Sequence, residues 1–467
     1  MTLTVTNVRS IRRRATALLV LVLVAGACRG SEKETGEAAA TTRASDAGVT
    51  TTAAESRGPG DFGDLADVCG PGDATGATAR GVTDTAIQIT TMGDPGNTIR
   101  PGLGQEGFDV ANGFAQRCNE AGGILGRKIE VHTRDAKLFE AGARFVEACQ
   151  TDFMSVGGGN GLDDATVEPR LGCELGQMPS FTASAKATEA DLQVLAAPNP
   201  LDRYPIGGIR LVSEAVPGTA EHFGLLGRDD ANGAATLNRA KDAAAMVGVT
   251  VVDVATHPAS AVDNWRPYVE TWRAKGVEMF TPISWPDISV IVQAMNDVGW
   301  QPKAIALTSI GYNDGTIAAA KNSDLPPTWV GLNYWPFELA DDNPAVSQLV
   351  DLVHSVNPDA KFTNFHVTAM NAWLLWAVSA KACGSDLTVE CVLREAKTQS
   401  SLTAGGMLPT VDLSVANPEP HSCFVLMRAT ADGFVYDEEV TQPTDSIYNC
   451  DPANEAHLTE DYSVDGG

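Results

Sequence analysis

The chain has 467 residues, a formal net charge of −26 and nine cysteines, and 43% of its residues are hydrophobic. A chain of this length exceeds what one hydrophobic core usually supports, so it predicts more than one folding unit. The acidic balance argues against a surface that attracts nucleic acid or anionic lipid through its electrostatic field, and it favours a solvated acidic surface.

The first 27 residues have the features of a secretory signal. Arginines 12–14 precede the apolar run Ala15 to Ala27, which is shorter than the ~17–25 residues that span a bilayer. The run ends in VAGAC at Cys28, which resembles a bacterial lipobox, so we expect removal of residues 1–27 and a lipid on Cys28. Ala25 is less typical than leucine at its position, so cleavage by an ordinary signal peptidase stays an alternative. Loss of this segment, with its four arginines, leaves a net charge of about −30.

Residues 28–68 are expected to form a flexible, lipid-anchored tether. They are rich in Ala, Thr, Ser, Glu and Gly and contain few large apolar residues. Such a segment buries too little apolar surface to offset the entropy of ordering it.

From about residue 83 the sequence alternates between strand and helix patterns. The first series predicts strands at 85–90, 128–133, 153–156 and 178–181, with helices at 108–118 and 139–149 between them. The second series predicts strands at 223–226, 249–255, 277–281, 304–307 and 329–332, with helices at 234–247, 265–275 and 286–298. Further helices are predicted at 344–356, 365–381 and 389–397, and strands at 423–428 and 433–436. Two such series predict an α/β chain with two doubly wound, parallel-sheet lobes.

Beyond Cys28 the chain has eight cysteines, an even number that predicts disulfides in an exported protein. No Cys-x-x-Cys pair occurs and the seven histidines are scattered, so we expect no metal site and no cofactor. The sequence contains no G-x-S-x-G or H-E-x-x-H motif and leaves no unpaired cysteine as a nucleophile. The neighbouring acids Asp163 and Asp164 more often cap a helix or face solvent than catalyse. We therefore expect a protein that is not an enzyme, with an exported hydrolase as the remote alternative.

The turn after the first long helix resembles a family motif. Residues 118–131 read CNEAGGILGRKIEV. In type I periplasmic binding proteins, and specifically in the branched-chain amino-acid-binding branch that serves ATP-driven importers, a helix ends in Asn-x-x-Gly-Gly-Ile-x-Gly-Arg before a strand that closes on an aspartate. The matching residues here are Asn119, Gly122, Gly123, Ile124, Gly126, Arg127 and Asp135, within a resemblance that extends over residues 83–440. These glycines are expected to shape the backbone and not to touch a solute.

The resemblance implies two lobes joined by a hinge of several strands, with a solute cleft between them. Residues 69–214 and 336–405 are expected to form the first lobe, and residues 215–335 and 406–450 the second. Residues 451–467 are expected to form a flexible C-terminal tail.

Binding residues are expected where strands end and helices begin. In the first lobe, the glycine-rich turn 157–161 predicts ligand contacts from Gly158, Gly159 and Asn160. In the family, the loop after the next strand offers hydroxyl and backbone N–H groups to a ligand carboxylate, a role that implies Thr182 and Ser184 here. Helix N-capping is an equally good interpretation of these two hydroxyls.

In the second lobe, the expected ligand contacts are Asn232, Trp285 and Tyr312. Amino-acid-binding members place an acidic group in this lobe against the ligand ammonium, but Ser309 stands at that position in a loose alignment. The candidates to replace it are Asp230, Asp287 and Asp314, each of which also fits a helix cap. The expected solute is therefore a small polar compound: an amino acid, an amide or urea-like compound, or a carboxylate.

The resemblance also implies neighbouring cysteines, and we expect the pairs Cys69–Cys118, Cys149–Cys173, Cys383–Cys391 and Cys423–Cys450. The implied function is a monomeric, lipid-anchored binding protein on the outer face of the cytoplasmic membrane. It would capture a solute by hinge closure and deliver it to an ABC permease with its ATPase. A receptor of the same fold that reports to a signalling partner is the alternative.

Overall fold

The computed structural model describes residues 58–98, 100–258, 262–283 and 288–462. The expected signal, the lipid site at Cys28 and most of the expected tether lie outside these residues. Among the described residues, no helix is long and apolar enough to cross a membrane.

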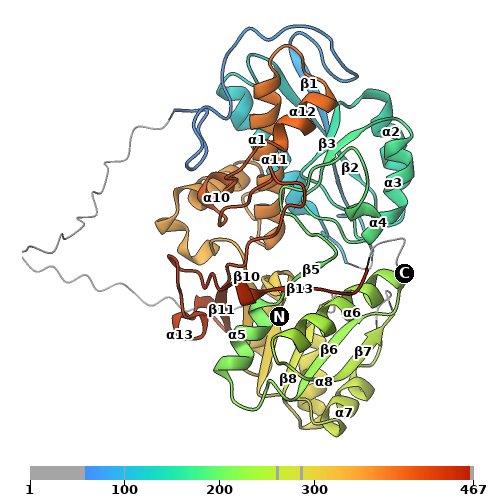
Figure 1. Cartoon of the computed structure of the whole chain (residues 1–467), viewed down its shortest axis with the longest axis vertical. Helices are drawn as coiled ribbons and strands as arrows, with labels where there is room; N and C mark the ends of the chain where they lie inside the picture. The colour runs from blue at the N-terminus through green and yellow to red at the C-terminus, as the bar shows by residue number, and fades with distance from the viewer. Residues whose placement is uncertain (1–57, 99, 259–261, 284–287, 463–467) are drawn as a thin grey trace, which may run out of the picture. The chain divides into compact units, whose positions relative to one another are not determined.

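The first lobe contains a four-stranded parallel sheet in the order β2-β1-β3-β4. Its strands are β1 (Ala86–Gly93), β2 (Lys128–Asp135), β3 (Met154–Val156) and β4 (Gly176–Met178). The helices between and after them are α1 (Gln105–Glu120), α2 (Ala141–Thr151), α3 (Asp164–Leu171) and α4 (Ala185–Thr188). Three helices from later in the chain complete this lobe: α10 (Pro344–Val356), α11 (Asn364–Cys383) and α12 (Val389–Ala396). Helices α10 and α11 pack against α1, and α12 packs against α11 (Figure 1).

The CNEAGGILGRKIEV turn is part of the scaffold. Gly122 and Gly123 have φ of +117° and +80°, which a residue with a Cβ rarely adopts. Asn119 braces β2, because its amide oxygen accepts from the N–H of Ile129 and its amide nitrogen donates to the Ile129 carbonyl, both at 2.8 Å. Arg127 is 1% exposed and donates to three backbone carbonyls. The motif therefore fixes the helix-to-strand connection, as expected.

The second lobe contains a seven-stranded sheet in the order β12-β11-β10-β9-β8-β6-β7. Its parallel strands are β6 (Phe223–Arg228), β7 (Val251–His257), β8 (Met279–Pro282), β9 (Ala304–Leu307) and β10 (Thr328–Leu332). Strands β11 (Val425–Thr430) and β12 (Gly433–Tyr436) join it in antiparallel orientation. The helices are α5 (Gly207–Ala215), α6 (Ala231–Met246), α7 (Arg266–Ala274), α8 (Ile288–Val298), α9 (Asp314–Asn322) and α13 (Glu438–Thr441).

The chain passes between the two lobes three times. It leaves the first lobe through β5 (Arg203–Pro205), returns after β10 through the 3₁₀ helix Phe337–Asp342, and passes back before β11. Helix α5 packs against β9 and β10, so the expected boundary at residue 214 instead lies before α5. The two-lobed, parallel-sheet fold predicted from the sequence is confirmed.

Both ends of the described chain are more ordered than expected. Phe62 and Val68, placed in the expected tether, are 2% and 1% exposed and belong to the core of the first lobe. In the expected C-terminal tail, β13 (Glu455–His457) pairs with β5, and Asn454 is fully buried. A few apolar side chains, such as Phe62 and Val68, pack into the core and thereby order these segments. Most of the surrounding residues are polar, so the sequence did not reveal this packing.

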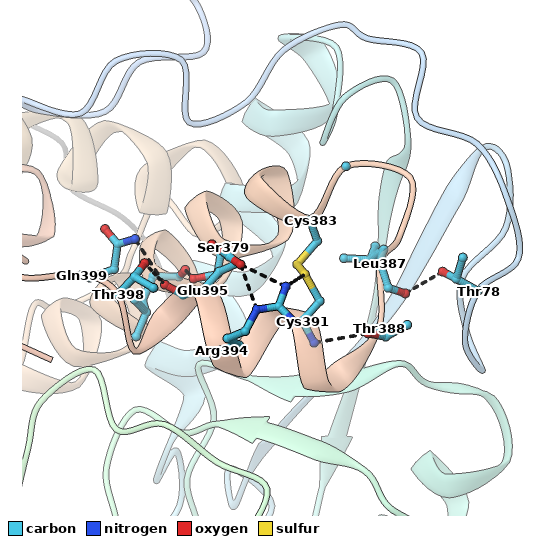
Figure 2. The surroundings of a disulfide bond; sticks show 12 residues. Thr78, Ser379, Cys383, Leu387, Thr388, Cys391, Arg394, Glu395, Thr398 and Gln399 are labelled. Carbon is cyan, nitrogen blue, oxygen red and sulfur yellow. Dashed lines mark hydrogen bonds and ion pairs between the residues drawn. A yellow bond between two sulfur atoms is a disulfide. The ribbon is translucent and has the colours of Figure 1, made fainter. Parts of the chain in front are cut away.

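All four expected disulfides are present: Cys69–Cys118, Cys149–Cys173, Cys383–Cys391 and Cys423–Cys450. Figure 2 shows the third, which joins the end of α11 to the first turn of α12. The hydroxyl of Thr388 caps α12 by accepting from the N–H of Cys391, and an Arg394 guanidinium N–H lies 3.2 Å from the Cys391 sulfur.

Candidate functional site

The candidate site is a cavity of about 370 Å³ lined by residues of both lobes. It lies at the carboxyl ends of strands, where open α/β sheets bind ligands. Gly227 and Arg228 end β6, Ile283 follows β8, Leu307 ends β9, and residues 308–310 follow it. Two larger hollows, of about 750 and 930 Å³, lie against α12 and along residues 413–418 and 458–462. Neither is lined by strand ends of both sheets, so we assign the site to the smaller cavity.

The first lobe contributes the loop after β4 and the start of α11. Phe181, Thr182 and Ala183 line the cavity from the loop, and Asn364 and Phe365 line it from the helix. Thr182 is the expected residue, and its hydroxyl also lies 2.8 Å from that of Thr188. Asn364 is 8% exposed, and its side-chain oxygen has no hydrogen-bond partner. This wall therefore offers two aromatic rings, a hydroxyl and an unsatisfied amide oxygen.

The backbone N–H groups of the same loop are already occupied. The carboxylate of Asp163 accepts from the N–H of Ala183 at 2.6 Å and from the N–H of Ser184 at 3.0 Å. Asp163 is 6% exposed, and burial raises its pKa above the ordinary value despite these hydrogen bonds. A carboxylate of the protein thus fills the position at which the family resemblance implied a carboxylate of the ligand.

The glycine-rich turn lies behind this wall. Gly158 and Gly159 do not line the main cavity: a Cβ on Gly158 would lie 2.4 Å from the Met92 backbone, and one on Gly159 2.4 Å from the Phe181 ring. Asn160 is 3% exposed, and its amide faces the carboxylate of Asp94 at 3.4 Å. These three expected ligand residues therefore serve the close packing of the loop.

The second lobe contributes one face of α6. Asn232, Gly233, Thr236 and Arg239 recur at helical spacing and line the cavity. Asp230 caps the helix by accepting from the N–H of Gly233, and it pairs with Arg228 at 2.7 Å. Asn232 is therefore the expected second-lobe residue that reaches the cavity, and Asp230 does not line it.

Arg239 is the functional candidate that sequence reasoning missed. It is 7% exposed, and its Nη2 donates to the carbonyls of Pro200, at 2.9 Å, and Arg203. Its Nε has no hydrogen-bond partner, and no carboxylate of the described residues forms an ion pair with it. Burial lowers the pKa of its guanidinium, which nevertheless stays a cation. The available signal was its position seven residues, or about two turns, after Asn232.

The remaining expected residues have other positions. Ser184 is 2% exposed and caps α4 by accepting from the N–H of Ala187. Tyr312 is 2% exposed, its ring centre lies 4.7 Å from that of Phe434, and its hydroxyl donates to Glu338, so it belongs to the core. Trp285 lies outside the described residues. Ser309 does line the cavity, whereas no aspartate or glutamate of the described residues does.

One group of side chains in the described part of the chain has the composition of a cation site: Glu419, Glu455 and His457. The Arg203 guanidinium lies 2.9 Å from Glu419 and 3.5 Å from Glu455. Arginine therefore already supplies the positive charge in this cluster, and the cluster lies outside the cavity.

Comparison with known proteins gives the same fold. The sequence model of the periplasmic binding protein family matches residues 210–433. The described residues have the fold of type I periplasmic binding proteins. No curated protein matches the sequence.

Solved structures of binding proteins share this fold at low sequence identity. A fatty acid ABC transporter substrate-binding protein from Thermomonospora curvata has a TM-score of 0.65 and 15% identity, covering 82% of this chain and 97% of its own. The branched-chain amino acid transporter substrate-binding protein LivJ from Streptococcus pneumoniae, in complex with isoleucine, has a TM-score of 0.59 and 14% identity, covering 76% and 100%. The leucine-binding protein LivK from Thermotoga maritima has a TM-score of 0.59 and 12% identity, covering 75% and 98%.

Proposed function

We propose that this chain is a periplasmic binding protein that captures a small organic solute between its lobes and delivers it to an ABC permease with its ATPase. The observation that carries the proposal is the cavity at the strand ends of both sheets, lined by Thr182 from one lobe and Asn232 from the other. A solute that contacts both walls binds the closed arrangement better than an open one, and so shifts the population towards closure.

The three chain passages between the lobes support a hinge. Hinges are formed by a few residues at the ends of elements. Here Asn199, Tyr204, Pro205 and Asn333 lie in segments that connect the lobes, and they line the cavity. A solute in the cavity would therefore contact the segments that bend when the lobes close.

We further propose that Cys28 carries a lipid that holds the protein on the outer face of the membrane. The VAGAC sequence after a short apolar run supports this proposal. Mass spectrometry of the mature protein tests it: a diacylglycerol adduct on Cys28 is expected, whereas a mature chain that begins elsewhere without a lipid contradicts it.

The function is tested by thermal unfolding of the purified chain, without detergent, against amino acids, amides, ureas, fatty acids and aromatic acids. A true solute at about 100 times its Kd should stabilise the chain by about 2.7 kcal/mol, and the shift should saturate. Small-angle X-ray scattering with that solute should show a smaller radius of gyration. Turnover of a solute, or no saturable shift with any compound, would show that the proposed function is wrong.

A further inference from the structure

The polarity of the cleft differs from that of a site for α-amino acids. On the first lobe, the N–H groups of Ala183 and Ser184 already donate to Asp163. A solute carboxylate placed there would displace a buried carboxylate of the protein or lie beside a like charge. Both arrangements are unfavourable, because like charges at short range in a poorly solvated site repel strongly.

The second lobe contains the opposite charge. Two arginines line the cavity, Arg228 and Arg239. Arg228 pairs with Asp230 at 2.7 Å, so a carboxylate of the protein already neutralises it. Arg239 is buried, donates to neutral backbone carbonyls, and forms no ion pair with a described carboxylate. Its stabilising surroundings are the longer-range charge of Asp202 and the Tyr204 ring, 5.8 Å from the guanidinium carbon. Because no described carboxylate contacts this buried cation, an anion in the cavity would stabilise it directly.

The remainder of the cavity is apolar or neutral. Its side chains include Phe181, Ile209, Leu307, Phe365 and Phe424. No aspartate or glutamate of the described residues lines the cavity, so the described walls offer a solute ammonium no carboxylate to offset its loss of hydration. A zwitterionic amino acid therefore matches these walls poorly, whereas an apolar acid matches them well.

We propose that Arg239 recognises the carboxylate of the solute, and that the solute is an apolar monocarboxylate without an ammonium group. This inference rests on the proposed function above and deepens it by naming the class of solute. Both N–H bonds of Nη2 are used by the Pro200 and Arg203 carbonyls, so a carboxylate would accept from the remaining Nη1 and Nε donors in single, charge-assisted hydrogen bonds. The apolar body of the solute then lies against the ring and branched side chains of the cavity.

The test compares matched pairs of compounds by isothermal titration calorimetry on the purified chain, without detergent. The probes are octanoate and octanamide, 3-phenylpropanoate and its amide, and leucine. The wild type should bind each acid at least about 10-fold more tightly than its amide, and leucine more weakly than either acid. This preference is measured on the wild type, so it tests the proposal even if a variant fails to fold.

The variant R239Q should weaken the acids by about 10- to 100-fold and the amides by less than about 3-fold, which removes the preference. R239K, which keeps the charge without the planar fork, should retain part of it. Arg210 supplies the control: it is 8% exposed, bonds to Asn454 and Glu214, and does not line the cavity. R210Q should therefore keep the wild-type ratio of acid to amide affinity.

Each other outcome overturns a defined part of the proposal. If R239Q weakens acid and amide by the same factor, Arg239 only braces the Pro200 and Arg203 carbonyls. If the wild type prefers leucine or the amides, the solute class is wrong while solute binding stands. If no compound here or in the wider panel binds, the proposed function fails as well.

Discussion

Replacing Asp163 should unfold the loop that forms the first-lobe wall of the cleft, and a small added anion should restore it. In the wild type, the Asp163 carboxylate accepts the N–H groups of Ala183 and Ser184 at 2.6 and 3.0 Å. The variant D163A leaves both donors without a partner in a buried position. The gap left by the carboxyl group has the size and polarity for formate, which can accept the same two N–H groups.

The magnitude follows from these two hydrogen bonds. Hydrogen bonds to charged groups contribute about 1.5–3 kcal/mol each, so the pair contributes about 3–6 kcal/mol. Part of this is offset by the cost of burying the charge, which is the same effect that raises the pKa of Asp163. We therefore expect D163A to lower the free energy of unfolding by about 2–4 kcal/mol. D163N should lose less, since its amide oxygen still accepts one N–H and no charge is buried.

Urea unfolding, with and without sodium formate at about 50 mM and with sodium chloride to match ionic strength, measures both effects. Formate should return at least about 1 kcal/mol to D163A and leave the wild type unchanged. The neighbouring Asp164 is the matched control, because it is exposed in the first turn of α3. D164A should change stability by less than about 0.5 kcal/mol. If D163A is as stable as D164A, or chloride restores it as well as formate does, the carboxylate does not hold the loop.

Three further predictions concern other parts of the chain. T182A should weaken solute binding, measured by calorimetry, by about 0.5–1.5 kcal/mol, because Thr182 lines the cavity. S184A should keep the affinity for the solute but lower the free energy of unfolding by about 1 kcal/mol, because it removes the cap of α4. Equal losses of affinity in the two variants would contradict this assignment. Burial raises the pKa of Glu455 from 4.5 to about 7, so the folded chain favours the protonated carboxyl group. The stability gained from this protonation is fully present below about pH 4.5 and is lost as the pH rises to about 7. The expected loss of unfolding free energy between these pH values is at most about 3 kcal/mol, and E455Q should abolish it. Urea unfolding at several pH values measures the loss, and the same pH profile in E455Q and the wild type would refute the prediction. A disulfide that closes a longer loop removes more entropy from the unfolded chain, and the sequence separations are 49 for Cys69–Cys118 and 8 for Cys383–Cys391. Replacing the first pair by alanines should therefore lower the free energy of unfolding by about 4 kcal/mol, and replacing the second by about 2.5 kcal/mol. The reverse order in urea unfolding would contradict this argument.

Most of the fold could be predicted because its strands are short apolar runs between helical patterns. Strands β9 and β10 lie within a residue of their predicted positions, and β6 begins where it was predicted and ends two residues later, since all three are fully buried or nearly so. Helix α5 was not predicted, because Gly207 and Gly208 at its start read as a loop. Glycine is required there: a Cβ on Gly207 would lie 2.4 Å from the Phe424 ring. Strand β13 was missed because its partner, β5, is about 250 residues earlier in the chain.

The candidate site was predicted less well than the fold. Sequence position after a strand identifies a loop near the cleft, and Thr182 lies there. Sequence position does not show which side of the loop faces the solute. Ser184, for example, lies two residues after Thr182 but caps α4. Tyr312 also follows a strand, but its ring packs with Tyr334 and Phe337. Arg239 could not be recognised as unpaired from the sequence, because the absence of a counter-ion is a property of the folded surroundings.

The charges of the cleft also determine which end of the solute faces each lobe. With Asp163 filling the loop on the first lobe and Arg239 unpaired on the second, a carboxylate is expected on the second lobe. The apolar body then contacts Phe181 and Phe365, whose rings lie 5.1 Å apart on the first lobe. Closure would therefore be driven by burial of apolar surface more than by hydrogen bonds between the solute and the first lobe.

This orientation has a calorimetric consequence. Burial of apolar surface gives a negative heat-capacity change of about 0.45 cal/mol/K for each Å². Across saturated acids from butanoate to octanoate, the heat-capacity change on binding should become steadily more negative, and F365A should reduce this dependence on chain length. Titrations at several temperatures between about 10 and 35 °C measure it. If the heat-capacity change does not vary with chain length, the apolar body stays outside the cavity, and closure must depend on polar groups such as Asn364.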